Sequence, residues 1–346
     1  MDRWLDGLED AARQALSEPL FRYLSQGARE GVSAGEATAA WRRHRLRPHV
    51  LRDVTEVDLS TTLLGAELAT PVGVAPTTLQ RAVNPEGELA MARAAADAGS
   101  LMVVSSNAGT PFTEIGETGV TWWLQAYLPS DRTLIEPLLK RAVEAGAQAV
   151  VLTADTPVVG TKYGGAGPTV WDEIDIDLLR VNFDDGYETA PGSEKATDLG
   201  PHDIGWVGET TGLPVVVKGV LRADDANRCT QAGARAIWVS NHGGRQLDRA
   251  VQTATALPDI VAAVSGDVEV YVDGGLRSGL DILTALALGG RGVFLGRLPI
   301  YALAGGEDAV RRMHAEIRRE LVECLRLSGC RTPADTEGLV SPGLPL

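Results

Sequence analysis

The most informative stretch of this chain is Ser240-Asn241-His242-Gly243-Gly244-Arg245, which directly follows the apolar run 236–239. That run has the composition of a short buried strand. A neutral imidazole at His242 can accept a proton near pH 7, and the guanidinium of Arg245 can grip a carboxylate through two parallel hydrogen bonds. The glycines allow a sharp turn and a close approach of the backbone to a ligand. A surface histidine after a strand is the ordinary alternative, but the other strand ends argue against it.

Apolar runs of this kind recur along the chain and alternate with helical stretches. We expect strands at 71–76, 101–106, 121–127, 149–155, 214–219, 236–240, 268–273 and 292–296, with intervening helices such as 86–98, 134–145, 223–232, 279–288 and 308–327. Strands that alternate with helices pair in parallel, and eight such units fit a closed (β/α)8 barrel. The predicted fold class is therefore α/β, one barrel domain over residues 1–346. A doubly wound open sheet is the alternative, although no Gly-x-Gly-x-x-Gly follows the first strand.

Two segments lie outside this alternation. Residues 1–60 are expected to form an N-terminal helical extension, because apolar residues recur there at helical spacing. Tyr23, in this extension, is either a core residue or a contributor to a site. Residues 156–213 form a connection far longer than an ordinary loop between a strand and a helix. It is either a mobile cover over the barrel mouth or a surface excursion without a role.

Polar and ionisable residues gather where the expected strands end. The carboxyl ends of barrel strands build the active site of this fold, and they carry here Thr77, Thr78, Ser105, Gln125, Tyr127, Thr153, Asp155, Lys218, His242, Arg245, Asp273 and Arg297. A second signal lies after the last two strands, in residues 273–279 and 295–297. Glycine N–H groups, a helix N-terminus and two arginines at these places are typical of a phosphate site.

Composition limits the classes of partner. The chain has a formal net charge of −14, which disfavours nucleic acid and anionic membranes as main partners. No apolar run is long enough to span a bilayer, and the first residues do not resemble a signal peptide, so we expect a cytoplasmic protein. Its three cysteines lack metal-binding spacing and are expected to be reduced packing residues; no metal site is expected.

Several motifs together resemble the FMN-dependent α-hydroxy-acid oxidase and dehydrogenase family over nearly the whole chain. They are residues 240–248 (Ser-Asn-His-Gly-Gly-Arg-Gln-Leu-Asp), 272–279 (Val-Asp-Gly-Gly-Leu-Arg-Ser-Gly), 217–220 (Val-Lys-Gly-Val), 75–77 (Ala-Pro-Thr) and 85–88 (Pro-Glu-Gly-Glu). The resemblance implies FMN-dependent oxidation of an (S)-2-hydroxy acid to the 2-oxo acid. It also implies a small-molecule substrate and a homo-oligomer, commonly a tetramer. Oxygen, a quinone and another protein stay open as the electron acceptor, and the lack of an apolar spanning run and of a haem domain favours O2 or a soluble acceptor.

The resemblance also implies roles for individual residues. His242 is the expected catalytic base, Asp155 its carboxylate partner, and Lys218 the cation beside the flavin ring. The expected substrate-binding residues are Tyr23, Tyr127, Lys162 and Arg245. The expected FMN-binding residues are Pro76, Thr77, Thr78, Ser105, Gln125, Thr153, Lys218, Ser240, Asp273, Gly274, Gly275, Arg277, Gly296 and Arg297.

Two departures from the family pattern concern the substrate. Lys162 occupies a position where the family usually has an arginine, so the charge is kept but the planar fork is lost. Asn107 occupies a position that is often a large side chain. A flavoenzyme acting on an amide, an amine or a bulky substrate therefore stays open. So do a non-redox isomerase or lyase on a phosphate-binding barrel and a non-catalytic binding protein, although the last would have little use for His242 beside Arg245.

Overall fold

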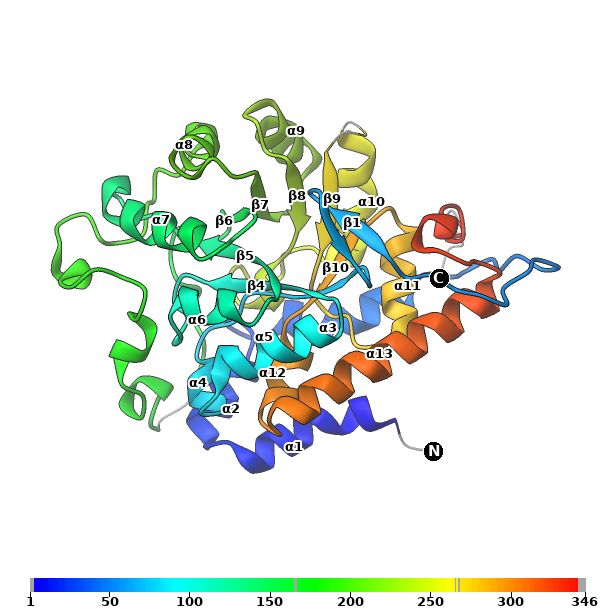
Figure 1. Cartoon of the computed structure of the whole chain (residues 1–346), viewed down its shortest axis with the longest axis horizontal. Coiled ribbons are helices and arrows are strands. Elements are labelled where there is room, and N and C mark those ends of the chain that lie inside the picture. The colour runs from blue at the N-terminus through cyan, green and yellow to red at the C-terminus, as the bar shows by residue number, and fades with distance from the viewer. Residues whose placement is uncertain (1–2, 165–166, 265, 267, 342–346) are drawn as a thin grey trace.

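The computed structural model describes residues 3–164, 167–264, 266 and 268–341. At its centre is a closed barrel of parallel strands in the order β10-β3-β4-β5-β6-β7-β8-β9 (Figure 1). The strands are β3 (Val72–Val74), β4 (Leu101–Ser105), β5 (Thr121–Ala126), β6 (Val150–Thr153), β7 (Val215–Val220), β8 (Ala236–Val239), β9 (Glu269–Val272) and β10 (Gly292–Leu295). All eight expected strands are present, and the predicted (β/α)8 barrel is confirmed.

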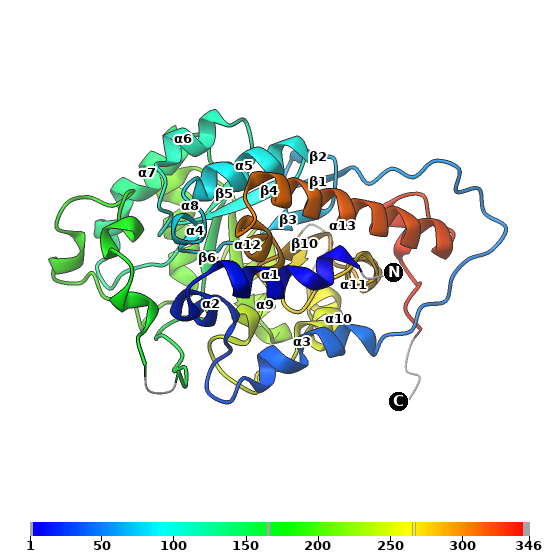
Figure 2. The same cartoon turned by 90° about the horizontal axis from the view of Figure 1, so that it is seen from below.

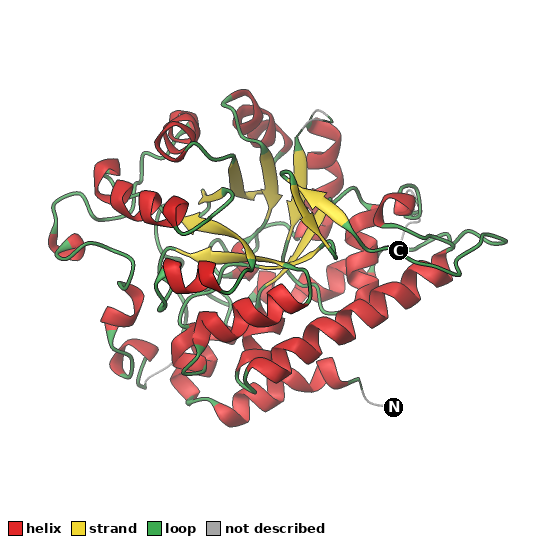
Figure 3. Ribbon diagram, in the orientation of Figure 1, coloured by secondary structure: helices red, strands yellow, loops and turns green. Residues whose placement is uncertain are grey.

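Helices surround the barrel on its outer face (Figure 3). They are α4 (Gln80–Val83), α5 (Gly87–Asp97), α6 (Phe112–Glu117), α7 (Glu136–Glu144), α8 (Pro201–Thr211), α9 (Ala223–Gln231), α10 (Thr253–Ala263), α11 (Gly279–Ala287), α12 (Arg297–Leu303) and α13 (Glu307–Ser328). A short 3-10 turn, η2 (Arg132–Ile135), precedes α7. The longest helix, α13, shows why the helices dock: its buried residues include Val310, Met313, Ile317, Leu321 and Leu325, which recur every three or four residues and form one apolar stripe.

The N-terminal extension is helical only in its first part. It contains the 3-10 turn η1 (Trp4–Gly7) and the helices α1 (Leu8–Ala15), α2 (Glu18–Ser25) and α3 (Val32–Arg42). Figure 2 views the molecule from below and shows α1 and α2 in front of the barrel, with α3 nearer the lower edge. Residues 43–60, which were expected to be helical as well, contain no helix.

A hairpin that the sequence analysis did not predict follows this extended segment. It consists of β1 (Thr61–Leu63) and β2 (Ala66–Leu68), paired antiparallel. Leu63 and Leu68 join the apolar cluster inside the barrel, which also contains Trp123, Trp238 and Phe294. The hairpin therefore closes the end of the barrel where the strands begin, and the opposite end is left for a ligand.

The long interval 156–213 is not a loop throughout. Its last part is the helix α8, which begins with Pro201 and ends before Gly212, a residue in the left-handed conformation. Proline at the first position and glycine just past the end are ordinary helix boundaries. The part before α8, at the left of Figure 1, carries three 3-10 turns: η3 (Val170–Asp172), η4 (Ile176–Leu179) and η5 (Tyr187–Thr189). We call residues 156–200 the excursion.

Candidate active site

A cavity of about 610 Å³ lies at the carboxyl ends of the barrel strands. Its wall contains most of the residues selected from the sequence: Tyr23, Pro76, Thr77, Thr78, Ser105, Gln125, Tyr127, Thr153, Lys162, Lys218, His242, Arg245, Asp273, Gly274, Gly275, Arg277, Gly296 and Arg297. Two selected residues, Asp155 and Ser240, are not on this wall. Both lie behind it and contact residues that are.

His242 is held by a carboxylate from the neighbouring part of the barrel. Its Nδ1 lies 2.9 Å from Asp155 Oδ1, and the two side chains are 24% and 14% exposed. Gly219, in a bulge of β7, permits this packing, because a Cβ there would lie 2.5 Å from the Cβ of Asp155. His242 itself has φ +58°, a conformation that is uncommon outside glycine. With Nδ1 bound to Asp155, Nε2 is the nitrogen that remains for the cavity.

The electrostatics favour a neutral imidazole beside an ionised carboxylate. Burial lowers the pKa of His242, and the carboxylate of Asp155 only partly offsets this. Burial raises the pKa of Asp155, but His242 and Lys218 outweigh that effect and hold it below its ordinary value. A neutral histidine whose Nδ1–H donates to a carboxylate can accept a proton at Nε2.

A buried cation stands next to this pair, at the end of β7. Lys218 Nζ donates to Ser240 Oγ at 3.0 Å and lies 3.3 Å from Asp273 Oδ2. Ser240 in turn donates to Asp273 Oδ1 at 2.6 Å. Ser240 is fully buried, so its place is behind the wall as a support for Lys218 and Asp273. This differs from the direct FMN contact expected from the sequence.

Two polar groups on the wall have no hydrogen-bond partner among the described residues. They are Gln125 Nε2 and Thr153 Oγ1, both buried. The other end of the Gln125 amide is fixed, because Oε1 accepts from Ser105 Oγ at 3.1 Å. A buried donor without a partner costs about 1–3 kcal/mol, so this part of the wall is shaped for a ligand with hydrogen-bonding edges.

Two arginines lie at the far end of the cavity, near the N-termini of α11 and α12. Burial lowers the pKa of Arg277, and it lowers that of Arg297 to about 10. Among the described residues neither forms an ion pair with a carboxylate; Arg297 donates instead to the carbonyl oxygens of Leu24 and Gln26. Two half-buried guanidinium groups beside helix N-termini have the chemistry that suits a phosphate.

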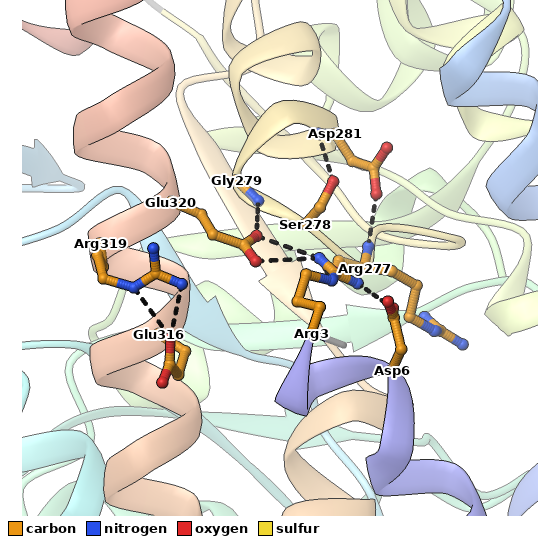
Figure 4. Close-up of polar contacts among 9 residues, drawn as sticks. All are labelled: Arg3, Asp6, Arg277, Ser278, Gly279, Asp281, Glu316, Arg319 and Glu320. Atoms are coloured by element: carbon orange, nitrogen blue, oxygen red, sulfur yellow. Dashed lines mark hydrogen bonds and ion pairs between the residues drawn. The ribbon is translucent and has the colours of Figure 1, made fainter. Parts of the chain in front are cut away.

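The turn that carries Arg277 is braced from two distant parts of the chain (Figure 4). Arg3 Nη1 donates to the carbonyl oxygen of Arg277 at 3.2 Å and pairs with Glu320 at 3.1 Å. Glu320 also accepts a hydrogen bond from the backbone N–H of Gly279 at 2.8 Å. Inside the turn, the N–H of Arg277 donates to Asp281 Oδ2 at 2.9 Å. The backbone of the turn is therefore fixed before any ligand binds.

Arg245 lies at the mouth of the cavity and is oriented by the N-terminal extension. Its Nη1 donates to the carbonyl oxygens of Tyr23 and Gln26 at 2.6 and 2.9 Å, and its guanidinium lies 4.9 Å from the centre of the Tyr23 ring. The hydroxyl of Tyr23 lies 3.3 Å from Thr78 Oγ1. Tyr23 therefore lines the cavity beside Arg245, and its contact with the substrate stays a prediction.

Lys162 does not present a free ammonium group to the cavity, as a residue that binds a substrate carboxylate would. Its ammonium group donates to the carbonyl oxygens of Gly160 and Arg245 at 2.7 and 2.9 Å. Burial is the main cause that lowers its pKa to about 8, with a further contribution from Arg245. Two of its three N–H donors are therefore used by the backbone, and one remains for a ligand.

Beyond Lys162, the excursion brings to the wall several residues that were not expected from the sequence. Val159, Trp171, Arg180 and Lys195 line the cavity from this segment. Arg180 pairs with Glu188 and reaches Asn107 Oδ1 at 3.4 Å. The sequence offered one signal, the rarity of lysine, because the chain has only four. In the structure three of them line this cavity.

The described residues lack two features. They contain no cluster of three or more histidine, cysteine or acidic side chains that would hold a metal ion. They also contain no helix with the length and apolar character needed to cross a bilayer.

Comparison with known proteins gives a consistent result. A family model described as "FMN-dependent dehydrogenase" matches residues 12–341. Glycolate oxidase 3 of Arabidopsis thaliana is 38% identical over 336 residues, which cover 94% of this chain and 91% of the relative. L-lactate oxidase of Nostoc sp. is 38% identical over 346 residues, covering 95% of each chain. A solved structure of a mandelate oxidase variant with (S)-mandelic acid superposes with a TM-score of 0.89 at 37% identity, covering 99% of this chain and 98% of that one.

Proposed function

Because this chain belongs to the FMN-dependent dehydrogenase family, we propose that its cavity binds FMN beside an (S)-2-hydroxy acid, with His242 as the base and Arg245 as the carboxylate clamp. The protein is an FMN-dependent oxidoreductase of 2-hydroxy acids; the enantiomer and the residue roles are the proposed part. The observation that supports these roles is the meeting of His242, Arg245 and Lys218 on one cavity wall.

The residues of the wall fit FMN along its whole length. The unpartnered donors Gln125 Nε2 and Thr153 Oγ1 match the hydrogen-bonding edges of an isoalloxazine ring. Lys218 lies between them and Asp273, where a cation would face the pyrimidine side of the ring and a carboxylate would face the ribityl hydroxyls. Arg277 and Arg297 would bind the phosphate, an anion that neither half-buried guanidinium group has among the described residues.

Bound FMN supplies the two-electron acceptor of the reaction. The protein's own part begins with Arg245, which binds the substrate carboxylate and fixes its orientation. Nε2 of His242 then accepts the proton that leaves the substrate, while Asp155 stabilises the imidazolium that forms. The hydroxyl of Tyr127, at the same end of the cavity, is kept protonated because burial raises its pKa, so it can donate a hydrogen bond to the substrate.

We further propose that O2 reoxidises the cofactor. The reaction is then 2-hydroxy acid plus O2 giving 2-oxo acid plus hydrogen peroxide, and the relatives named as oxidases support it. Peroxide formed in a one-to-one ratio with 2-oxo acid would support O2 as the acceptor; turnover only with an added artificial acceptor would contradict it. A homo-oligomer is proposed from the family resemblance alone, and light scattering of the purified protein would test it.

A second candidate substrate is a 2-hydroxy amide or an amine. The observation in its favour is that Lys162 donates two N–H groups to backbone carbonyls, so it offers less to a carboxylate than a free arginine would. A solved structure of a mandelate oxidase variant contains 2-hydroxy-phenylacetamide. The amide or amine would use the same base, His242, and would not need the charge of Arg245.

The test uses the purified yellow protein under anaerobic conditions. We expect (S)-2-hydroxy acids to bleach the flavin absorbance and the matching amides and amines to bleach it more slowly. We expect His242→Ala to retain FMN and to lose reduction. If amides or amines react faster than acids, the second candidate is correct; if His242→Ala reduces the flavin at the parent rate, His242 is not the base.

A further inference from the structure

Lys195 is a cavity residue to which the function proposed above gives no task. Lysine is rare in this chain, which has four lysines among 32 lysine and arginine residues. Three of the four, Lys162, Lys195 and Lys218, line the cavity. Lysine differs from arginine in presenting a compact ammonium group with three donors on a flexible stem. The question is what the ammonium group of Lys195 binds.

The backbone of Lys195 is fixed, although it belongs to the irregular excursion. Lys195 forms an antiparallel bridge with Pro129, just after β5. The N–H of Ser130 donates to the carbonyl oxygen of Glu194 at 2.8 Å, and the N–H of Ala196 donates to that of Leu128 at 2.9 Å. Hydrogen bonds on both sides of Lys195 thus attach this point of the excursion to the barrel.

The side chain of Lys195 is placed as well. Its Nζ lies 3.8 Å from the centre of the Tyr127 ring, in a cation–π contact. Among the described residues, no carboxylate forms an ion pair with it. Burial lowers its pKa to about 8, and Asp155 only partly offsets this effect. The ring therefore orients the ammonium group without neutralising it, and an anion in the cavity would stabilise its charged form.

Each of the other cations on the wall already has an anion or a backbone partner. Lys218 pairs with Asp273, Arg180 pairs with Glu188, and Arg22 pairs with Glu18. Lys162 donates to two carbonyl oxygens. Arg277 and Arg297 are assigned to the phosphate of the cofactor, and Arg245 to the substrate carboxylate. Lys195 has no assigned anion, so the ligand can carry one more negative charge than the substrate proposed above.

We propose that Lys195 is a specificity-determining residue that binds a carboxylate on the side chain of the substrate. The substrate class is then a 2-hydroxy acid with a second carboxylate, in place of an acid with an apolar side chain. This inference rests on the proposed function, because Arg245 must hold the first carboxylate if Lys195 is to hold the second.

Two matched pairs of (S)-acids test the proposal. They are 2-hydroxybutanoate with 2-hydroxybutanedioate, and 2-hydroxypentanoate with 2-hydroxypentanedioate, so that each pair differs only in the second carboxylate. The apparent Kd of each acid is measured from anaerobic flavin reduction. The Kd of the corresponding 2-oxo acids is measured from the change they cause in the flavin spectrum, which requires no turnover.

The variants are Lys195→Met and Lys195→Gln, with Lys140→Met as the matched control. Lys140 is 60% exposed and lies on α7, where its contact is with Glu136. We expect the parent to prefer the diacid of each pair. We expect both Lys195 variants to lose about 10- to 100-fold in affinity for diacids, because a charged hydrogen bond is removed, while their affinity for monoacids and their FMN content stay at the parent level.

The outcomes separate this inference from the function beneath it. Equal losses on monoacids and diacids would show that Lys195 binds the carboxylate beside the hydroxyl, and a parent that prefers monoacids would show that it binds no second anion; either result overturns the inference and leaves the oxidation of hydroxy acids intact. If no hydroxy acid reduces the flavin, the proposed function fails. The titrations with 2-oxo diacids and monoacids would then still decide whether Lys195 selects a second carboxylate.

Discussion

Replacing Asp155 with Asn should slow flavin reduction by about 10- to 150-fold while FMN stays bound. The change removes the charge behind His242 but keeps the size of the side chain. The hydrogen bond at risk joins Nδ1 to Oδ1 over 2.9 Å between two mostly buried side chains. Hydrogen bonds to charged groups are worth about 1.5–3 kcal/mol, and each 1.4 kcal/mol in an activation barrier changes the rate by about tenfold.

The same variant should also change the pH profile. Asp155 raises the pKa of His242 against the lowering effect of burial. Without the carboxylate, the pKa of His242 falls further. Because the base must be neutral to accept a proton, the acid limb of kcat/KM should move to lower pH in Asp155→Asn.

The assay is anaerobic rapid mixing with substrate, with the FMN content of each variant measured first. Thr156→Val is the comparison variant, since it removes a hydroxyl 3.1 Å from Asp155 Oδ1 and 3.5 Å from His242 Nδ1 but keeps the carboxylate. It should therefore leave the acid limb closer to that of the parent than Asp155→Asn does. An Asp155→Asn variant that reduces its flavin at the parent rate, with an unmoved acid limb, would refute the assigned partnership between Asp155 and His242.

Three further predictions follow from the same cavity. Gln125→Leu should weaken FMN binding by about 5- to 30-fold, measured by flavin fluorescence, without lowering the melting temperature of the apoprotein, because the parent buries an unpartnered donor there; a destabilised apoprotein would contradict this. Arg297→Met should weaken binding of FMN but not of riboflavin, as seen by titrating both into apoprotein, since only FMN carries the phosphate; equal losses would argue against a phosphate contact. Finally, anionic ligands should bind fully below about pH 8 and more weakly as the pH rises through it, because the ammonium groups of Lys162 and Lys195 have pKa values of about 8. The other titratable or charged groups near these two lysines are Tyr127, Asp155 and Arg245. A binding affinity that does not change with pH would show that neither amine binds the anion.

The barrel and the cofactor end of its cavity were predictable because they depend on local patterns. Apolar runs that end in a polar residue identify both a strand and its carboxyl end, which is how Gln125, Thr153 and Lys218 could be placed on one wall. The same sequence pattern does not distinguish a side chain on the cavity wall from one that is buried behind the wall, however. Ser240, for example, was expected to contact FMN directly, whereas the structure buries it fully behind the wall; the roles of Ser240 and Asp155 in the site stay predictions.

The features that the sequence did not reveal depend on tertiary contacts. The strands of the β1–β2 hairpin have three residues each, and they are stable because Leu63 and Leu68 enter the barrel. Lys195 lies in a segment without helical or strand periodicity, so only its pairing with Pro129 brings it to the cavity. Helix α8 could have been predicted, because Pro201 and Gly212 mark its two boundaries in the sequence. These two signals were not used.

The brace around the phosphate turn has a consequence for biosynthesis. Arg3 leaves the ribosome long before Glu320, yet both hold the same turn at Arg277 and Gly279. A nascent chain cannot assemble this brace until α13 has emerged. FMN should therefore be captured only after α13 has been synthesised, and a ribosome stalled before α13 should display a barrel that stays colourless.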